Sequence, residues 1–115
     1  MKIVTEKGFI EISNEVFTGI SGAAAMNCFG VKAMAVRTAA TGIIGRIKRG
    51  FFSKGVKVEI KDDSTAVIEL HIIVDHGVNI AAVSRSIMSE VAYVVEDRTG
   101  VSVARVDVFV DSITA

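Results

Sequence analysis

The sequence predicts an α+β fold in which a single layer of helices lies on a mixed β-sheet. Three observations predict it. Several short segments alternate between apolar and polar residues, two longer segments repeat their apolar residues every three or four positions, and the second of these lies between two strand patterns. The predicted order is strand, helix, strand, short helix, strand, strand, long helix, strand. A helical crossover makes the strands it joins parallel, whereas a tight turn makes them antiparallel.

The first third of the chain predicts a strand, a helix and a second strand. Residues 7–13 (KGFIEIS) alternate in polarity, and residues 31–36 (VKAMAV) read as the second strand. Ser13 or Asn14 can cap the helix between them, and Gly30 can end it in a left-handed conformation. Val16, Ile20, Ala23 and Asn27 fall on one stripe of this helix, with Phe17, Ala24 and Cys28 beside it.

The middle of the chain predicts a short helix over residues 38–52 and then an antiparallel hairpin. Residues 56–61 (VKVEIK) and 65–76 (TAVIELHIIVDH) are its strands, and the Asp-Asp-Ser turn at 62–64 joins them. On the longer strand the alternation separates two faces. Ala66, Ile68, Leu70, Ile72 and Val74 share the inward face, and Glu69, His71 and Asp75 lie on the other.

The last third predicts a long helix and a final strand. Asn79 caps the helix and Gly100 stops it. Its apolar stripe is expected to contain Ile80, Val83, Ile87, Val91, Val94 and Val95. Residues 102–111 (SVARVDVFVD) form the last strand, with Ala104, Val106, Val108 and Val110 inward.

Length and composition indicate one domain over residues 1–115 with an aliphatic core. Half of the residues are apolar, only 6% are aromatic, and there is one cysteine, which excludes an intrachain disulfide and fits a cytoplasmic protein. No apolar run reaches the length of a membrane span or a signal peptide. Any work at a membrane is therefore expected to need a partner that holds the protein there.

The net charge of zero hides a basic middle and an acidic C-terminal half. Residues 30–61 carry eight cations and one acid, whereas residues 62–115 carry three arginines and nine acids. This division favours contact with an anionic partner or charge-matched self-association. The alternatives are that the two halves pair within the fold, or that the charges only keep the surface solvated. The candidate partner- or anion-binding patch consists of Arg46, Lys48, Arg49 and Lys54.

The basic stretch 41–52 (TGIIGRIKRGFF) contains the glycine spacing of two phosphate-binding patterns. Gly45 and Gly50 have the spacing of a P-loop, but Phe51 and Phe52 stand where lysine and a hydroxyl residue are required, which excludes that site. The Gly42–Gly45 pair has the spacing of an RNA-clamping G-x-x-G loop, but two isoleucines between the glycines argue for a packed helix. A weak, salt-sensitive RNA-binding module using residues 41–54 stays as the alternative function.

A second candidate surface is the face of the sheet that the helices leave open. We expect it to carry self-association, because so many apolar residues on a wet face are typical of an interface. The alternative is that loops or residues 38–52 cover it. The predicted residues are Phe9, Met34, Val36, Val67, Ile73, Val103 and Phe109.

The sequence offers little for catalysis. Cys28 lies on a predicted helix with no histidine nearby, and reads as a small buried apolar residue rather than a nucleophile. Glu69, His71 and Asp75 could join in a zinc site, but carboxylate and imidazole two residues apart are ordinary on a solvated strand face. We therefore expect no catalytic residue, no metal and no cofactor.

Four blocks of the chain carry a resemblance to a known family. They are "GFIEISNEVFTGISGAAAMNCFGVKAMA", "FFSKGVKVEI", "ELHIIVDHGVNIAAVSRSIMSEV" and "TGVSVARVDVFV", which together span about residues 7–111. In this order they resemble the alkaline shock proteins of Gram-positive bacteria, also called envelope stress response proteins. His71 and His76 stand where that family usually has aromatic residues.

The resemblance implies a small α+β domain without known catalytic residues. It also implies a cytosolic protein that self-associates and gathers beneath the membrane through a separate membrane-anchored partner. Members similar to this short form are often encoded beside a dihydroxyacetone-kinase-like protein active in fatty-acid phosphorylation. The resulting hypothesis is a non-enzymatic scaffold or accessory protein of envelope stress homeostasis, acting through a homo-oligomer and by docking to a membrane-anchored or kinase-like partner.

Overall fold

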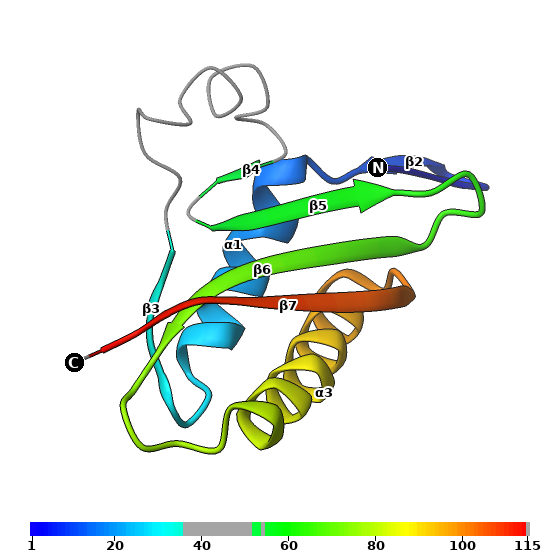
Figure 1. The fold of residues 1–115 in the computed structure, drawn as a ribbon. Coiled ribbons are helices and arrows are strands. Elements are labelled where there is room, and N and C mark those ends of the chain that lie inside the picture. Colours follow the sequence, from blue (N-terminus) through cyan, green and yellow to red (C-terminus); the bar gives the residue numbers. More distant parts are fainter. Residues whose placement is uncertain (36–51, 54, 115) are drawn as a thin grey trace.

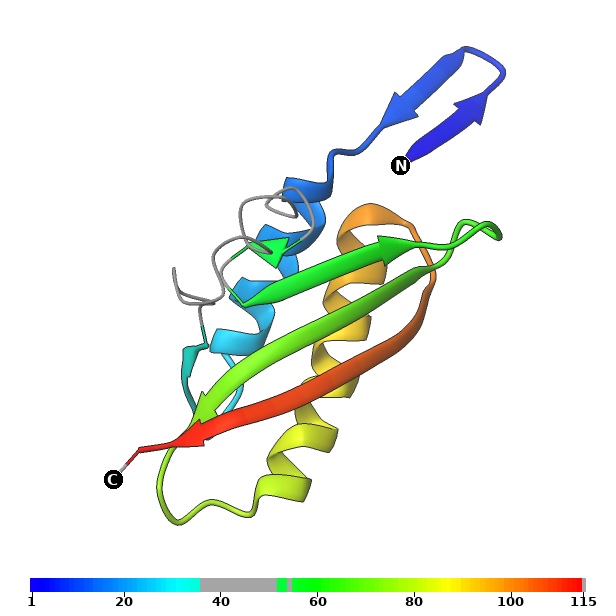
Figure 2. The same ribbon diagram turned by 45° about the horizontal axis from the view of Figure 1, so that its top comes forward.

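The computed structural model describes residues 1–35, 52–53 and 55–114. The elements are β1 (Lys2–Thr5), β2 (Gly8–Glu11), α1 (Asn14–Met26), β3 (Val31–Met34), β4 (Phe52–Ser53), β5 (Val56–Ile60), β6 (Ala66–Val74), α3 (Ile80–Thr99) and β7 (Val103–Ile113). Both helices lie behind one face of a mixed sheet, and the other face carries no described helix (Figures 1 and 2). The predicted α+β class is therefore confirmed.

Strand β6 is the centre of the five-stranded sheet. β7 runs parallel to it over its whole length, from Ala66–Val103 to Val74–Ile113. The opposite edge of β6 is shared, because β5 pairs antiparallel with residues 66–70 and β3 pairs antiparallel with residues 72–74. The short β4 extends the sheet beyond β5. The predicted antiparallel hairpin and the parallel crossover through the long helix are both confirmed.

The core lies between this sheet and the two helices. The five residues of β6 that were predicted to face inward are completely buried: Ala66, Ile68, Leu70, Ile72 and Val74. They meet a row of valines and isoleucine on α3 at helical spacing: Val83, Ile87, Val91 and Val95. Burying such a side chain stabilises the fold by about 1.5–3 kcal/mol, so this layer is the main source of stability.

The ends of α3 match the sequence prediction. The Asn79 side chain accepts a hydrogen bond from the backbone N–H of Ala82 at 3.0 Å. Gly100 is left-handed with φ 75°, and its N–H donates to the carbonyl of Glu96. Arg98 lies in the last turn, where a cation favours the helix dipole.

Helix α1 differs from the prediction in its end and in its buried face. It ends at Met26 with Asn27 as the C-cap, and Gly30 is left-handed but lies in the turn beyond. Its buried residues are Phe17, Thr18, Ser21, Ala24 and Ala25, while Val16 is exposed. The buried stripe is thus the one that begins at Phe17, because burying a phenylalanine removes more apolar area than burying the valine next to it.

The first strand was predicted in the wrong sheet. Residues Gly8–Glu11 pair antiparallel with Lys2–Thr5, a strand that the sequence analysis missed, and together they form a separate two-stranded sheet. This hairpin extends away from the two-layer body (Figure 2). The hydrogen bonds between Met1 and Ile12 close its base.

Two other expectations fall at the gaps in the described residues. The predicted short helix over 38–52 lies outside them, apart from residue 52, which belongs to β4. The predicted strand 31–36 is a strand as far as Met34, and Val36 also lies outside the described residues.

Gly55, at the beginning of the turn into β5, occupies a position that only glycine can fill without strain. Its φ is 80°, and a Cβ there would lie 3.0 Å from the carbonyl oxygen of His71 and 3.1 Å from that of Ala35. Both oxygens belong to the backbone, so they cannot move without disturbing β3 or β6. We expect Gly55→Ala to destabilise the protein by about 2–4 kcal/mol, as the sum of the left-handed strain and this crowding.

Gly100→Ala is the matched control. Gly100 has a similar φ of 75°, but nothing lies within 4 Å of the position of its Cβ. Its cost should therefore be the left-handed strain alone, about 1–2 kcal/mol. Urea unfolding of both variants measures the difference, and equal losses would show that the crowding at Gly55 has no energetic weight.

Candidate functional site

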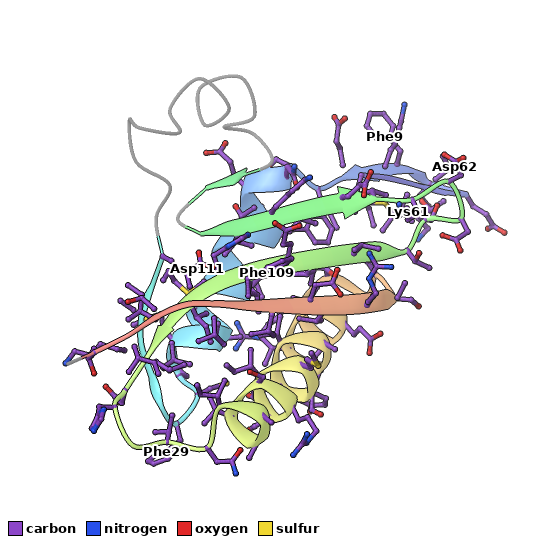
Figure 3. All side chains as sticks on the ribbon, viewed as in Figure 1. Phe9, Phe29, Lys61, Asp62, Phe109 and Asp111 are labelled. Carbon is purple, nitrogen blue, oxygen red and sulfur yellow. The ribbon has the colours of Figure 1, made fainter. Side chains whose placement is uncertain are left out.

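The open face of the sheet carries a cluster of one histidine, two carboxylates and one phenylalanine. Glu69 and His71 belong to β6, which pairs with β7. Phe109 and Asp111 come from β7 (Figure 3). The parallel register pairs His71 directly with Phe109. A bulge between Val110 and Ser112 follows, and Asp111 is its unpaired residue.

Both ring nitrogens of His71 face carboxylate oxygens. Nε2 lies 2.7 Å from Glu69 Oε2, and Nδ1 lies 3.0 Å from Asp111 Oδ2. A neutral imidazole has a single N–H, so it can donate to only one of these oxygens, whereas a protonated ring donates to both. The ring therefore links a carboxylate of β6 to a carboxylate of β7.

The His71 ring is also held by stacking and burial. It lies parallel to the Phe109 ring, with centroids 4.7 Å apart and an angle of 9° between the planes. The His71 side chain is only 2% exposed, whereas Phe109 is 45% exposed. The imidazole is thus buried and held in place, and the Phe109 ring lies between it and the solvent.

The metal site considered from the sequence is not assembled. Asp111, not Asp75, completes the cluster around His71, and both ring nitrogens already lie against carboxylates. In the described part of the chain, no group of three or more histidine, cysteine or acidic residues is placed to hold a metal ion. Sequence reasoning missed Asp111 because simple alternation gives the face of a residue on its strand but not the register against β6.

The seven residues predicted for the self-association face are not brought together. Val67, Ile73 and Phe109 do lie on the open face. Met34 pairs with the inward Ile72 and packs against the core, so its predicted position on the open face is wrong. Phe9 lies on the separate N-terminal hairpin (Figure 3). Val36 lies outside the described residues.

Val103 was also placed on the wrong face, for a reason the register makes clear. It pairs with Ala66 and packs against the core, while Ala104, predicted inward, is exposed. The next pair is Val67 with Arg105, so Ala104 is an extra residue in β7. This bulge restores the predicted inward positions from Val106 onward.

The predicted basic patch, Arg46, Lys48, Arg49 and Lys54, lies outside the described residues. Among the described residues, the largest exposed aromatic side chain by fraction is that of Phe29, which is 84% exposed in the turn after α1 (Figure 3). It lines a shallow cavity of about 210 Å³ together with Asn79, Ala82, Val83 and Ser86 at the start of α3. An apolar ring beside an apolar hollow is a feature that suits contact with another protein.

Cys28 is partly buried at the end of α1, and its Sγ donates to the carbonyl of Ala24 at 3.4 Å. Burial raises the pKa of the thiol, and the negative charge of Glu90 raises it further. Both effects disfavour the thiolate, which is the reactive form. The interpretation of Cys28 as a packing residue fits this environment.

Comparisons with known proteins agree with one another. The model of the alkaline shock protein 23 family, described as having a cell envelope-related function, matches residues 2–115. The uncharacterized protein YloU of Bacillus subtilis is 31% identical over 114 residues, covering 98% of this chain and 94% of that protein. Spy1614 of Streptococcus pyogenes serotype M6 is also 31% identical, covering 98% and 93%. YqhY of Bacillus subtilis is 31% identical, covering 92% and 77%.

No solved structure matches the chain significantly. Neither helix in the described residues combines the length and the apolar character that crossing a bilayer requires.

Replacing His71 tests the cluster as a structural bridge. In His71→Ala, two carboxylates lose their shared donor and Phe109 loses its stacking partner, so we expect a destabilisation of about 2–3 kcal/mol. His76→Ala is the control, because His76 is exposed and the described hydrogen bond of its residue is made by the backbone N–H. That variant should change stability by no more than about 0.5 kcal/mol. Urea unfolding measures both, and equal effects would contradict the role given to His71.

Proposed function

The chain belongs to the alkaline shock protein 23 family, whose function is cell envelope-related, and from this premise we propose that it is a non-enzymatic scaffold or accessory protein of cell-envelope homeostasis. It acts by self-association and by docking to a second protein that is either anchored in the membrane or kinase-like. Its place is the cytoplasm, and the partner brings it to the membrane.

The observation that carries this proposal is the amount of large apolar side chain left in water. In the described residues, the following are at least 38% exposed: Val4, Phe9, Ile10, Val16, Met26, Phe29, Ile80, Met88, Tyr93, Phe109 and Ile113. They occur on the N-terminal hairpin, on both helices, on the open sheet face and in the turn that holds Phe29. Exposed apolar side chains on several surfaces support a protein that contacts more than one neighbour.

A non-enzymatic role is supported by how the most reactive groups are held. The His71 ring has each nitrogen against a carboxylate, so neither nitrogen is presented to a substrate. The environment of Cys28 disfavours its thiolate. These two side chains therefore fit structural work better than proton transfer or nucleophilic attack.

Docking is expected to have an apolar and an electrostatic component. Phe29 supplies an apolar contact beside the cavity at the start of α3. The cations of the sequence between residues 30 and 61 supply positive charge for an acidic partner. The electrostatic component should weaken with salt, because exposed charges are screened within about 8–10 Å at physiological ionic strength.

Charge reversal tests the docking. The full chain carrying Arg46→Glu with Arg49→Glu should be recovered with the membrane fraction of native cells at least about fivefold less than the wild type, since each reversal turns an attraction into a repulsion. The matched control is Arg85→Glu with Arg98→Glu, which makes the same change in net charge on two exposed residues of α3. If both double variants are recovered with the membrane fraction to the same extent, the basic patch does not contribute to docking.

Phe29→Ser tests the apolar contact in the same assay. We expect it to reduce recovery of the chain with the membrane fraction several-fold without changing the melting temperature, because the ring is almost fully in water in the free protein. Tyr93→Ser, at an exposed position on α3, is the control. If neither charge reversal nor Phe29→Ser changes recovery, and the pure protein is a monomer at every concentration, the scaffold function is wrong.

A further inference from the structure

We propose that the outer edge of β7 binds β7 of a second copy of this chain, antiparallel, with the two-fold axis at Val108. The two five-stranded sheets then become one continuous sheet. This inference rests on the self-association in the proposed function and names its surface. It differs from the open-face contact expected from the sequence, because the contact is made by the edge of the sheet.

Strand β7 is a long edge strand in the described part of the chain. It runs from Val103 to Ile113 and pairs only with β6 among the described strands. Figures 1 and 2 show no described strand on its other side. Such an edge is a row of unpaired backbone donors and acceptors, ready to pair with another strand.

The hydrogen bonds of β6 show which residues of β7 face that outer edge. His71 directs its N–H to Gly55 and its carbonyl to Ala35, away from β7. Ala66 donates to Ser102 and Val74 accepts from Thr114, so these alternate residues of β6 face β7. In a parallel pair, a residue that bonds to its neighbour strand bonds to the residues on either side of its register partner. The register partners of Ile68, Leu70 and Ile72 therefore direct their own N–H and C=O groups outward.

Those register partners are Val106, Val108 and Val110. They lie in the regular stretch between the two bulges at Ala104 and Asp111. With the axis at Val108, Val108 lies opposite itself and Val106 lies opposite Val110 of the second copy. All of the outward amides of this stretch then have partners.

Charge and the bounds of β7 together favour this register, because an axis at Val110, although free of like-charge pairs, would leave Arg105 without a partner in β7. Side chains directly opposite in a sheet lie on the same face, so open-face residues must meet open-face residues. An axis at Asp107 would place Asp107 against its own copy, and an axis at Phe109 would place Asp107 against Asp111, both of which are repulsive. An axis at Val106 would pair Val110 with Ser102, which lies outside β7.

The axis at Val108 places Arg105 opposite Asp111 of the second copy, twice by symmetry. Arg105 is exposed and uses Nε for its described bonds to Asp107, which leaves its terminal amino groups for a second carboxylate. Asp111 uses Oδ2 for His71, which leaves Oδ1. A surface that complements itself in this way is what a two-fold contact requires, so the occupant that fits the edge is a second copy.

The partial exposure of two valines on the helix side of β7 also supports pairing with a second copy. Val108 and Val110 pack against the core but remain partly exposed, whereas the facing residues of β6 are completely buried. In the proposed pairing, the valines of one copy lie beside those of the other. The contact would therefore extend both cores as well as both hydrogen-bond ladders.

Disulfide trapping tests the register. Asp107 would lie opposite Phe109 of the second copy in a pair without mutual hydrogen bonds, with Cα atoms about 4.5 Å apart, within the range that a disulfide bridges. In a Cys28→Ser background, Asp107→Cys and Phe109→Cys chains carrying different tags are co-expressed, purified and oxidised. We expect the mixed dimer to form at least about tenfold more than either cross-linked homodimer, since like positions are about 7–8 Å apart. Preferential cross-linking of Asp107→Cys to itself would overturn the axis at Val108.

Sedimentation equilibrium of the full chain tests the edge. The wild type should reach twice the mass of one chain. Val108→Pro removes an outward N–H at the axis but none of the bonds to β6, so it should give a folded monomer, with folding checked by thermal melting. Arg105→Glu should raise the dimer dissociation constant at least about tenfold, and the control Arg85→Glu, on the exposed side of α3, should not change it.

The outcomes separate this inference from the proposed function. A wild type that stays a monomer at every concentration overturns both the edge contact and self-association. A dimer that is unaffected by Val108→Pro and Arg105→Glu overturns the edge contact and leaves self-association standing. If Val108→Pro leaves the mass unchanged but loses a protein that co-purifies from native cells, the edge binds that protein and the second copy is the wrong occupant.

Discussion

The burial of one face of β6 is the constraint on which the rest of the structure depends. Its five inward side chains have no exposure at all, and they belong to the same core cluster as the buried residues of both helices. At about 1.5–3 kcal/mol for each large apolar residue, this face outweighs every polar contact described on the molecule. Because side chains alternate strictly along a strand, fixing the inward face also fixes Val67, Glu69, His71 and Ile73 on the open side. The site is thus a consequence of the core.

The two bulges in β7 decide which of its residues face the core and which face the open side of the sheet. Between them, the strand follows β6 residue by residue, and Val106, Val108 and Val110 stay inward. At Ala104 and at Asp111 the strand has one residue more than β6. The first bulge brings Val103 inward and leaves Ala104 exposed. The second lies at Asp111, whose carboxylate contacts the ring of His71, a contact that depends on the register between β6 and β7.

The sequence could predict whatever depends on periodicity alone. The two strands of the β5–β6 hairpin, the inward face of β6, and α3 with its Asn79 cap and Gly100 stop all follow from spacing and from local hydrogen bonding. What it could not predict depends on pairing between distant segments. Lys2–Thr5 has no strong alternation, and it becomes a strand because Gly8–Glu11 folds back on it. Likewise, Glu69 and His71 were recognised as neighbours, but Asp111 is 40 residues from His71 and joins them only through the register.

The cluster on the open face and the edge of β7 are two parts of one electrostatic arrangement. Around His71 there are two carboxylates and one imidazole, so the acidic side chains of the cluster outnumber the basic one. Asp111 is 37% exposed, and its described contact with His71 uses Oδ2 alone. A cation supplied from outside would complete the group, and Arg105 of a second copy is the cation that an antiparallel edge contact brings there. The imidazole would then be the inner end of a series of polar contacts that runs from β6 across β7 into the neighbouring subunit. Removing His71 should therefore weaken association as well as folding, a link that two unrelated surfaces would not show.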